Sequence, residues 1–405
     1  MNTDMLEFDE AQRRLSEAGN APSATETCTL ATAFGRVLAE DITARVDLPP
    51  ADNSAMDGYA IRFADYAPER ALPVQQRCFA GQTPEALKPG QTIRLFTGCV
   101  MPDGADTIVM QENVVEQDGS ITITQLPVLG EHVRKRGEDV EQDQQILTTG
   151  TVLHAGQIAL LASQGIHEVK VYPRLKVGIL TTGDELVNPG QPLGPAQIYN
   201  SNGAMLAGLV AQMGGVVGQT LHAADTHEAI ESAFLALLAE CDLVLTVGGV
   251  SVGEKDLVKP VLELLGGTLD LWRVCMKPGK PVALAKVRNK PVVCLPGNPV
   301  SAFVVFGLLV SPLVRQLQGR TDLFPPVSYG RLRTSKSFHE TREEFLRVQC
   351  KPSRSGLPAL VPYELQGSAI ISALPWASGL ARIPVNTTVS DDDVVAYYDF
   401  AHWLS

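Results

Sequence analysis

From residue 175 onward, the chain alternates apolar runs of strand length with segments of helical periodicity. The expected strands cover residues 176–180, 216–220 and 243–247, and the expected helices cover residues 202–213 and 227–239. Near-continuous apolar strands separated by helices are typical of a parallel sheet covered on both faces. Loops that follow such strands meet at the carboxyl ends of the strands, where these sheets bind ligands. The pattern predicts an α/β domain with a ligand site at that edge.

The remaining sequence predicts three further regions. Residues 6–18 and 31–41 have helical patterns and form an N-terminal helical lead. Short β-like runs separated by Gly, Pro and Asp turns fill residues 61–139 and predict a small β domain. After Pro325 and Pro326 the chain returns to β-like alternation, which predicts a separate C-terminal module.

One apolar run raises the question of a membrane segment. Residues 303–314 are too few to cross a bilayer, which needs about 20 apolar residues, and Gly307 and Pro312 interrupt the run. We therefore predict a buried helix. Residues 1–10 are acidic rather than basic and apolar, so neither a secretory signal nor a membrane partner is expected.

Composition and charge narrow the classes of partner. The chain has 405 residues, more than one hydrophobic core usually serves, so two to four domains are expected. A net charge of -12 disfavours nucleic acids and anionic membranes, because these surfaces repel an acidic protein. The seven cysteines are scattered without a C-x-x-C pair, so neither a disulfide framework nor a zinc site is indicated. A reducing, cytoplasmic location is expected.

Four irregular polar loops carry the candidate chemistry. They cover residues 50–60, 181–185, 248–256 and 295–299. In the third loop, Gly248 and Gly249 let the backbone approach an anion, and Ser251, Lys255 and Asp256 add a hydroxyl, a cation and a carboxylate. The spacing matches neither a P-loop nor a Rossmann motif, and a tight turn without a ligand is the alternative.

The fourth loop precedes the apolar helix and allows two interpretations. Asn298 and Pro299 form a favourable N-cap and N1 pair, which is typical of a helix start. Exposed amides at a helix start, including those of Gly297 and Asn298, also bind phosphate. Both interpretations can hold together.

Charged side chains in the loops are candidates for metal and anion binding. Carboxylates stand in separate loops at Asp57, Asp139, Glu185, Asp225 and Asp256. Such oxygens suit Mg²⁺, which commonly bridges one or two carboxylates to substrate phosphates, although an isolated Asp is often only a turn residue. Lys277 and Lys280 occupy one turn and Arg134 opens a basic cluster, so both places concentrate positive charge. A solvated surface is the alternative for these cations.

Taken together, these motifs resemble the MoeA family of molybdopterin molybdenumtransferases over nearly the full length. The first four are DNSAMDGYA (52–60), FTGCVMPDGADTIVMQE (96–112), RKRGEDV (134–140) and ILTTGDEL (179–186). The others are IYNSN (198–202), GGVSVGEKD (248–256), MKPGKP (276–281) and LPGNPVSAF (295–303). So many ordered matches make the resemblance specific.

The resemblance implies a multidomain α/β plus β fold and an elongated homodimer. Its four domains would be an extended N-terminal domain (1–47 with 144–174), a β-rich inserted domain (48–143), a three-layer α/β/α molybdopterin-binding domain (175–323) and a C-terminal β-barrel (324–405). The family's active cleft lies between the molybdopterin-binding domain of one subunit and the β-rich domain of the other. Acidic loops far apart in sequence would thereby share one site.

The implied reaction is the insertion of molybdate into adenylated molybdopterin, with Mg²⁺-dependent cleavage of the phosphoanhydride and release of AMP. The expected catalytic residues are Asp57, Asp139, Glu185 and Asp256, of which Asp57, Glu185 and Asp256 would hold Mg²⁺. The expected substrate-binding residues are Thr97, Arg134, Asp225, Gly248, Gly249, Ser251, Lys277, Lys280, Gly297, Asn298, Arg347 and Ser368. Within this set, Thr97, Arg134 and Ser368 are the choice for molybdate, because hydroxyls and a guanidinium suit oxyanions.

Other molybdenum cofactor assembly proteins and apo-molybdoenzymes are candidate partners. Two alternative functions remain at this point. The molybdopterin-binding fold also serves molybdopterin adenylyltransferases, although these need neither the N-terminal nor the C-terminal modules. A binding or scaffold protein, as in gephyrin, is the other alternative, although the full set of acidic loops disfavours it and no appended interaction domain is expected.

Overall fold

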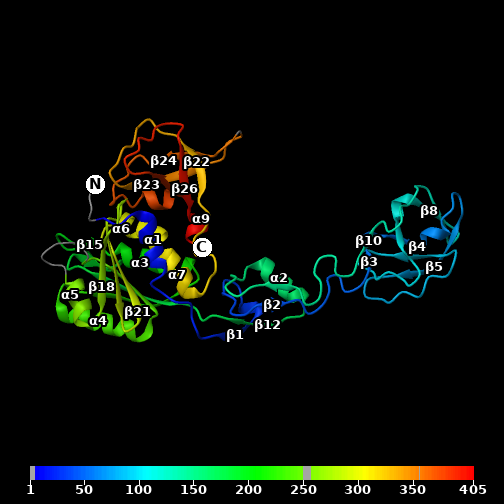
Figure 1. The fold of residues 1–405 in the computed structure, drawn as a ribbon, viewed down its shortest axis with the longest axis horizontal. Helices are drawn as coiled ribbons and strands as arrows, with labels where there is room; N and C mark the ends of the chain where they lie inside the picture. The colour runs from blue at the N-terminus through cyan, green and yellow to red at the C-terminus, as the bar shows by residue number, and fades with distance from the viewer. Residues whose placement is uncertain (1–4, 250–256, 355) are drawn as a thin grey trace. The chain divides into compact units, whose positions relative to one another are not determined.

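The computed structural model describes residues 5–249, 257–354 and 356–405 (Figure 1). Ser251 and Asp256, both predicted site residues, lie outside them. The chain divides into two compact units. The large unit comprises Met1–Glu40, Thr149–His154 and Glu168–Ser405, and the small unit comprises Asp41–Thr148 and Ala155–His167. The four-domain division stays a prediction.

The small unit is built on a mixed sheet with the strand order β7-β4-β6-β5-β9-β8. These strands are β4 (Gly58–Ile61), β5 (Leu72–Cys78), β6 (Thr92–Leu95), β7 (Thr107–Met110), β8 (Val114–Gln117) and β9 (Ser120–Ile123). Its other elements are β2 (Ile42–Thr43), β3 (Asn53–Ser54), η2 (Phe63–Asp65), η3 (Gln111–Asn113), β10 (Val133–Arg134), β11 (Gln145–Leu147) and α2 (Ala155–Ser163). The predicted β-like runs are confirmed as β6, β7 and β9.

Strand β4 shows why this sheet forms a core on both faces. All four of its residues are buried. Tyr59 and Ile61 belong to one apolar cluster, whereas Ala60 belongs to another with Ile93 and Ile108. Successive side chains of a strand point to opposite faces, so one short apolar strand serves both clusters.

The α/β part of the large unit has a six-stranded sheet with the order β16-β13-β17-β21-β20-β18. Its strands are β13 (Lys176–Thr182), β16 (Val216–Ala223), β17 (Leu243–Val247), β18 (Thr268–Arg273), β20 (Pro281–Val287) and β21 (Lys290–Leu295). The first four in this order are parallel, as predicted, whereas β20 pairs antiparallel with both of its neighbours, β21 and β18. Arg288 and Asn289 both have positive φ and close a two-residue hairpin between β20 and β21. Such a hairpin forces antiparallel pairing.

Helices cover both faces of this sheet (Figure 1). They are α3 (Ser201–Gln212), α4 (His227–Glu240), α5 (Val258–Leu264), α6 (Pro299–Val305) and α7 (Ser311–Gln318), together with α1 (Phe8–Ser16). Val177 and Ile179 pack in one core cluster with α1, α3, α6 and α7, whereas Leu180 packs in a second with α4 and α5. The predicted three-layer arrangement is confirmed.

The predicted buried helix is confirmed, and it is longer than expected. The π-helix η4 (Phe306–Val310) joins α6 to α7, so Gly307 and Pro312 do not end the helical run. Pro312 has no N–H to donate four residues back, and the carbonyl of Leu308 accepts instead from the Gln12 side chain at 2.6 Å. By length and apolar composition this helix could span a membrane, but 83% of its most apolar window is buried inside the protein.

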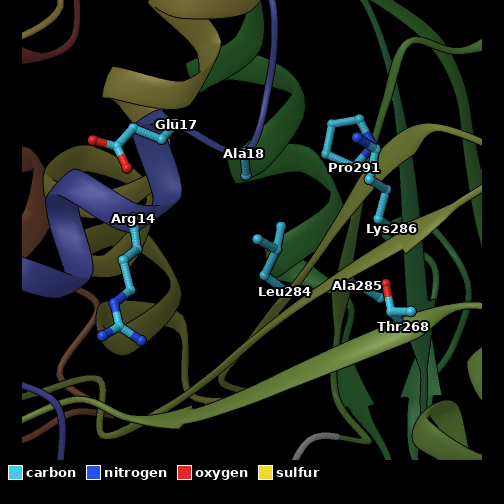
Figure 2. A pocket seen from close by; sticks show the side chains of 8 residues that line it. All are labelled: Arg14, Glu17, Ala18, Thr268, Leu284, Ala285, Lys286 and Pro291. Atoms are coloured by element: carbon cyan, nitrogen blue, oxygen red, sulfur yellow. The ribbon is translucent and has the colours of Figure 1, made fainter.

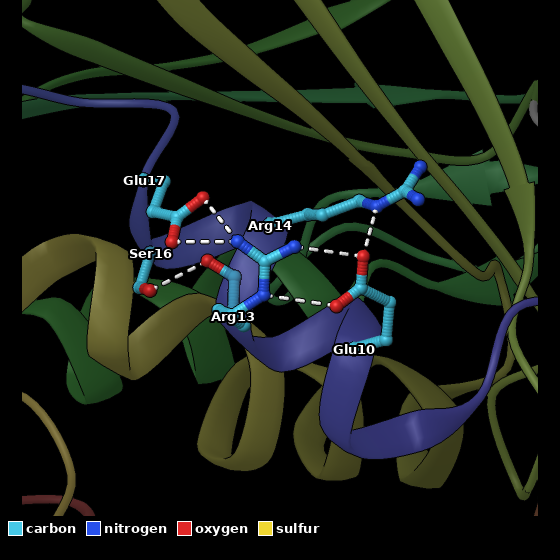
Figure 3. Close-up of polar contacts among 5 residues, drawn as sticks. All are labelled: Glu10, Arg13, Arg14, Ser16 and Glu17. Atoms are coloured by element: carbon cyan, nitrogen blue, oxygen red, sulfur yellow. Dashed lines mark hydrogen bonds and ion pairs between the residues drawn. The ribbon is translucent and has the colours of Figure 1, made fainter.

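One face of helix α1 packs against the rest of the large unit, and the other face is exposed to solvent. On the exposed face, Glu10 accepts hydrogen bonds from Arg13 and Arg14, which lower the pKa of Glu10 to about 2 (Figure 3). On the packed side, Arg382 bonds Asp9 at 2.8 Å and lies over the ring of Phe8. The exposed pairs contribute little to stability, so the packed face holds the helix.

The C-terminal β-barrel that the family resemblance implies is confirmed. Its strands are β22 (Ser328–Leu332), β23 (Glu343–Lys351), β24 (Ala359–Pro362), β25 (Gly379–Ile383) and β26 (Val394–Asp399), and its helices are α8 (Ala373–Trp376) and α9 (Phe400–Trp403). They pair in the order β23-β24-β22-β26-β25, and β25 pairs back to β23 and closes the ring. The short strand β19 (Met276–Lys277) joins β23 in parallel. The MKPGKP motif therefore connects the α/β part to the barrel.

The prediction of a helix at residues 31–41 was wrong. Only the short η1 (Leu30–Thr32) forms there, after β1 (Glu26–Thr29), which pairs with β12 (Glu168–Val171). Gly35 then has a φ of 71°, and Val37 and Leu38 form β-bridges to Val152 and Val171. β-Pairing with residues far away in the sequence overrides the local helical pattern of this stretch. Local periodicity cannot predict such pairing.

Candidate functional site

A cavity of about 850 Å³ opens at the carboxyl ends of β13, β17 and β21. Its polar walls come from Thr181, Thr182, Glu185, Asn200, Asn202, Gly248, Gly297 and Asn298. Its apolar walls include Ile198, Tyr199 and Ile371. Of the predicted site residues, Glu185, Gly248, Gly297 and Asn298 meet here. The cavity lies at the edge where parallel strands present ligands.

The glycine at the end of β17 is required by close packing. Gly248 has a φ of 98°, and a Cβ atom there would lie 2.8 Å from Thr182 Oγ1 and 2.9 Å from the Thr182 carbonyl oxygen. Gly249 also has a positive φ of 66°. Glycine adopts a positive φ readily because it has no Cβ atom. At these two positions no side chain covers the backbone beside the cavity.

The loop before α6 is held from two sides. Asn298 occupies the N-cap position and Pro299 follows at the helix start, as predicted, but the Asn298 side chain makes no cap hydrogen bond. It donates instead to Ser368 Oγ at 3.1 Å. On the other side, Asn202 Nδ2 donates to the Gly297 carbonyl at 2.7 Å. The start of α6 therefore has a fixed position beside the cavity.

Arg347 lies behind this loop. It is 1% exposed, and its guanidinium donates to the carbonyls of Leu365 and Gly367. Burial lowers the pKa of Arg347 to about 10. The side chain therefore holds the segment that leads to Ser368, and Arg347 itself does not line the cavity.

Lys277 carries a charge that is already paired. Its Nζ lies 2.7 Å from Glu340 Oε1 and 3.0 Å from the buried Glu344 Oε1. Burial alone would lower the pKa of Lys277, but hydrogen bonds to the two carboxylates outweigh burial and raise it. Lys280, in contrast, is exposed, and the cavity wall begins at the next residue, Pro281.

Two carboxylates meet at the ends of β13 and β16. The Asp225 amide donates to Asp184 Oδ1 at 3.1 Å, and the Asp184 amide donates to Asp225 Oδ2 at 3.4 Å. Glu185, the next residue, lines the cavity and is exposed. Among the described residues, no group of three or more His, Cys, Asp or Glu side chains is placed to hold a metal ion.

The small unit holds the other predicted residues. Thr97 donates from its amide at 2.8 Å and from its hydroxyl at 2.7 Å to Asp57 Oδ1. These two hydrogen bonds hold the pKa of Asp57 below its ordinary value. Arg94, whose guanidinium lies over the rings of Tyr59 and Phe96, also favours the charged form of Asp57. Asp57 is therefore a preformed carboxylate.

The basic segment predicted at residues 134–139 lies next to the Asp57 loop within the same unit. Strand β10 pairs with β3, which places Arg134 opposite Asn53. Arg134 and Asp139 are both exposed. Between them, Lys135 forms an ion pair with Asp52 at 2.8 Å. The structure thus brings Asp57, Thr97 and Arg134 into one region, and Asp139 stands at the end of that segment.

Sequence reasoning missed two of the asparagines that line the cavity, Asn200 and Asn202. Asn200 caps α3 by accepting from the Gly203 amide, and it donates to Thr181 Oγ1 at 2.8 Å. Asn202 lines the cavity from the first turn of α3. Both lie in the IYNSN motif, which is the signal that could have found them.

A separate hollow of about 340 Å³ lies beside α1 (Figure 2). It is lined by Arg14, Glu17, Ala18, Thr268, Leu284, Ala285, Lys286 and Pro291. These side chains combine opposite charges with apolar groups, and none belongs to the predicted set. The cavity at the strand ends is therefore the candidate site of the large unit.

Comparisons with known proteins cover nearly the whole chain. Residues 6–165 match the MoeA N-terminal region (domain I and II), residues 178–316 a probable molybdopterin binding domain, and residues 329–400 the MoeA C-terminal region (domain IV). A molybdopterin molybdenumtransferase of Haemophilus influenzae is 41% identical over 332 residues, which are 82% of either chain. One from a Nostoc species is 39% identical over 78% of this chain and 74% of its own. The crystal structure of the molybdopterin biosynthesis moeA protein from Pyrococcus horikoshii aligns with a TM-score of 0.82 at 28% identity, covering 98% of this chain and 100% of that one.

Proposed function

The chain belongs to the MoeA family, and from this we propose that it inserts molybdate into adenylated molybdopterin, with Mg²⁺-dependent cleavage of the phosphoanhydride and release of AMP. In reaction class it is an enzyme, a transferase of molybdenum cofactor biosynthesis. The observation that carries the proposal is the cavity of about 850 Å³ at the carboxyl ends of β13, β17 and β21, inside the region that matches a molybdopterin binding domain.

The cavity suits the pterin and phosphate portions of such a substrate. Gly248 and Gly249 let backbone amides approach phosphate oxygens without a side chain between them. The first amides of the helix that starts at Pro299 add the positive end of a helix dipole, a contribution of about 0.3–1 kcal/mol. In this acidic protein, backbone amides and the helix dipole would therefore provide the local positive potential that attracts the anionic substrate. Lys280 is exposed and adds a cation, whereas the charge of Lys277 is already neutralised by Glu340 and Glu344.

Mg²⁺ fits the donor chemistry of the acidic residues. Mg²⁺ prefers oxygen ligands and is commonly held by one or two carboxylates plus substrate phosphates, so a cage of three protein ligands is not needed. Glu185 and the predicted partners Asp57 and Asp256 would hold it, with Asp225 beside Glu185. When bound, the ion would polarise a phosphoryl oxygen and stabilise the charge that develops during cleavage.

Asp57 and Thr97 supply charge and hydroxyl chemistry from the small unit. Two hydrogen bonds from Thr97 keep Asp57 ionised, which suits a metal-binding carboxylate. Thr97, Arg134 and Ser368 would bind the molybdate oxygens. The Thr97 hydroxyl proton now points to Asp57, so this hydroxyl must rotate before it donates to an oxyanion.

The family resemblance also supports a homodimer and contacts with other cofactor assembly proteins and apo-molybdoenzymes. The odd number and scattered positions of the seven cysteines support a cytoplasmic location. These remain parts of the proposal.

The test is a reaction of the purified protein with adenylated molybdopterin, molybdate and Mg²⁺, followed by AMP release and by reactivation of a cofactor-free molybdoenzyme. We expect both signals, and we expect AMP release to stop when either molybdate or Mg²⁺ is omitted. AMP release without added molybdate, together with no reactivation, would contradict insertion. Formation of adenylated molybdopterin from ATP and molybdopterin would instead indicate the adenylyltransferase.

A further inference from the structure

Lys277 faces more negative charge than it can neutralise. Its Nζ lies 2.7 Å from Glu340 Oε1 and 3.0 Å from Glu344 Oε1. One cation is therefore shared by two carboxylates, and one negative charge is left over when all three side chains are ionised. An anionic ligand cannot bind Lys277 while both carboxylates stay in place, because the local charge repels it.

The two carboxylates differ in how firmly they need the lysine. The Glu344 side chain is only 6% exposed, and Glu344 lies opposite Lys277 where β19 pairs with β23. A buried carboxylate that loses its cation is strongly unfavourable, so Glu344 must keep Lys277. The Glu340 side chain is 32% exposed, and water can hydrate it after it leaves. Because such an exposed ion pair contributes little to stability, Glu340 is the partner that can be exchanged.

The exchange requires only a rotation of the Glu340 side chain. The Glu340 carbonyl accepts from the Asn386 amide at 2.8 Å, which holds the main chain in place. A lysine ammonium has three donors, so Lys277 can keep Glu344 and offer a donor to a ligand once Glu340 has turned away. The Lys277 side chain is 35% exposed, so an ion from solvent can reach it. The turn that begins at Lys277 borders the cavity at Pro281.

We propose that Glu340 is an exchangeable counter-ion of Lys277, which a tetrahedral oxyanion of the substrate displaces on binding. The inference rests on the proposed function and adds a means of selection at the same site. A lone inorganic anion must displace Glu340 without help from other contacts. Adenylated molybdopterin makes further contacts in the cavity, and these offset the displacement. Glu340 therefore lowers the affinity for free anions, which an acidic protein with exposed cations would otherwise bind.

The test measures the binding of inorganic molybdate and inorganic phosphate by isothermal titration calorimetry. Glu340→Gln keeps the size of the side chain and removes its charge. We expect this variant to bind at least one of the two oxyanions about fivefold more tightly than the wild type, the upper size for a partly exposed ion pair. The oxyanion whose affinity rises more identifies the group that Lys277 receives, molybdate or a substrate phosphate.

Glu364→Gln is the matched control. It removes an exposed carboxylate from another loop of the same barrel and changes the net charge equally. It should bind both oxyanions like the wild type. Equal tightening in the two variants would overturn the inference, because it would show a general effect of net charge.

A purely structural role of Glu340 predicts a different result. If Glu340 only holds Lys277 in place, Glu340→Gln would weaken oxyanion binding or leave it unchanged, and either result would overturn the inference. Absence of measurable binding to Glu340→Gln would overturn it as well. Because the titrations need no turnover, the two proposals fail separately. Unchanged oxyanion affinity in a protein that releases AMP contradicts the inference alone, whereas tighter binding by Glu340→Gln in a protein without AMP release contradicts the proposed function alone.

Discussion

The cavity of the large unit and the Asp57 region of the small unit differ in the kind of polar groups they contain and in the contacts that hold these groups. In the cavity, the polar groups are mostly backbone and neutral side chains, and long-range hydrogen bonds such as Asn202 to Gly297 hold them. Around Asp57, the groups are charged and exposed, and contacts within one small sheet hold them. The cavity therefore suits the binding of a ligand, whereas the Asp57 region provides charged side chains in fixed positions.

The comparison also distinguishes two arginines, both of which the sequence predicts to bind substrate. Arg347 is 1% exposed and serves the loop before Ser368, whereas Arg134 is exposed on β10. Similarly, the cation of Lys277 is neutralised by two carboxylates, whereas Lys280 is exposed. Charge in a motif therefore does not by itself identify a ligand contact.

The largest effect is expected at Asp57. Asp57→Asn keeps the shape of the side chain but removes its charge, so turnover should fall at least about 100-fold, the usual size for a lost electrostatic contribution to catalysis. The measurement is AMP release at saturating substrate. Asp118→Asn, which removes an exposed carboxylate from the turn between β8 and β9, is the control and should retain turnover. Undiminished AMP release by Asp57→Asn would refute the role of Asp57.

Substitution of the two arginines should affect the free energy of unfolding to very different extents. Arg347→Met removes the donors to two carbonyls in a buried site, so the free energy of unfolding should fall by about 2–4 kcal/mol. Arg134→Met should change it by less than about 0.5 kcal/mol, because surface substitutions rarely matter more. Urea denaturation of both variants measures the contrast. Equal stabilities would show that Arg347 is not a structural residue.

Glycine substitutions sharpen the account of the cavity wall. Gly248→Ala places a methyl group against Thr182 in a left-handed backbone, so the free energy of unfolding should fall by about 1–3 kcal/mol. In Gly208→Ala, within α3, the new methyl group meets no neighbour, and stability should rise by about 0.5–1 kcal/mol. Thermal denaturation of the pair measures the difference. A neutral Gly248→Ala would show that the close approach to Thr182 is not required.

The smallest effect is a change of pH dependence at Asp57. Its pKa in the folded protein lies below the ordinary value of 3.8, so its stabilisation is present above 3.8 and is lost as the pH falls through the folded pKa. Thr97→Val removes the hydroxyl donor and should raise the pKa of Asp57 towards 3.8. The variant should therefore be less stable than the wild type at neutral pH, with a difference that narrows at pH values well below 3.8. Carboxyl NMR titration of Asp57 measures the shift, and an unchanged pKa would contradict it.

Much of the fold follows from the sequence. Continuous apolar runs such as β17 (Leu243–Val247) have few alternatives to a buried strand, and the ordered motifs identify the family. The helix predicted at 31–41 failed because Val37 and Leu38 pair with residues more than 100 positions away. Local periodicity contains no record of such pairing.

The candidate site was predictable in its location but not in its detail. Loops after β13 and β17 were expected at one edge, and Glu185 and Gly248 do line one cavity. Which side chains remain available depends on partners distant in sequence. Asn298 donates a hydrogen bond to Ser368, and Lys277 forms ion pairs with Glu340 and Glu344. These contacts depend on the packing of the barrel against the α/β part, which cannot be predicted from any of the motifs.

Binding and turnover measured on the same variant test the central claim most directly. The account predicts that Asp57→Asn binds adenylated molybdopterin with a dissociation constant within about threefold of the wild type, because the cavity does the binding, while AMP release is lost. A variant that loses binding and turnover together would contradict the separation of the binding cavity from the charged Asp57 region.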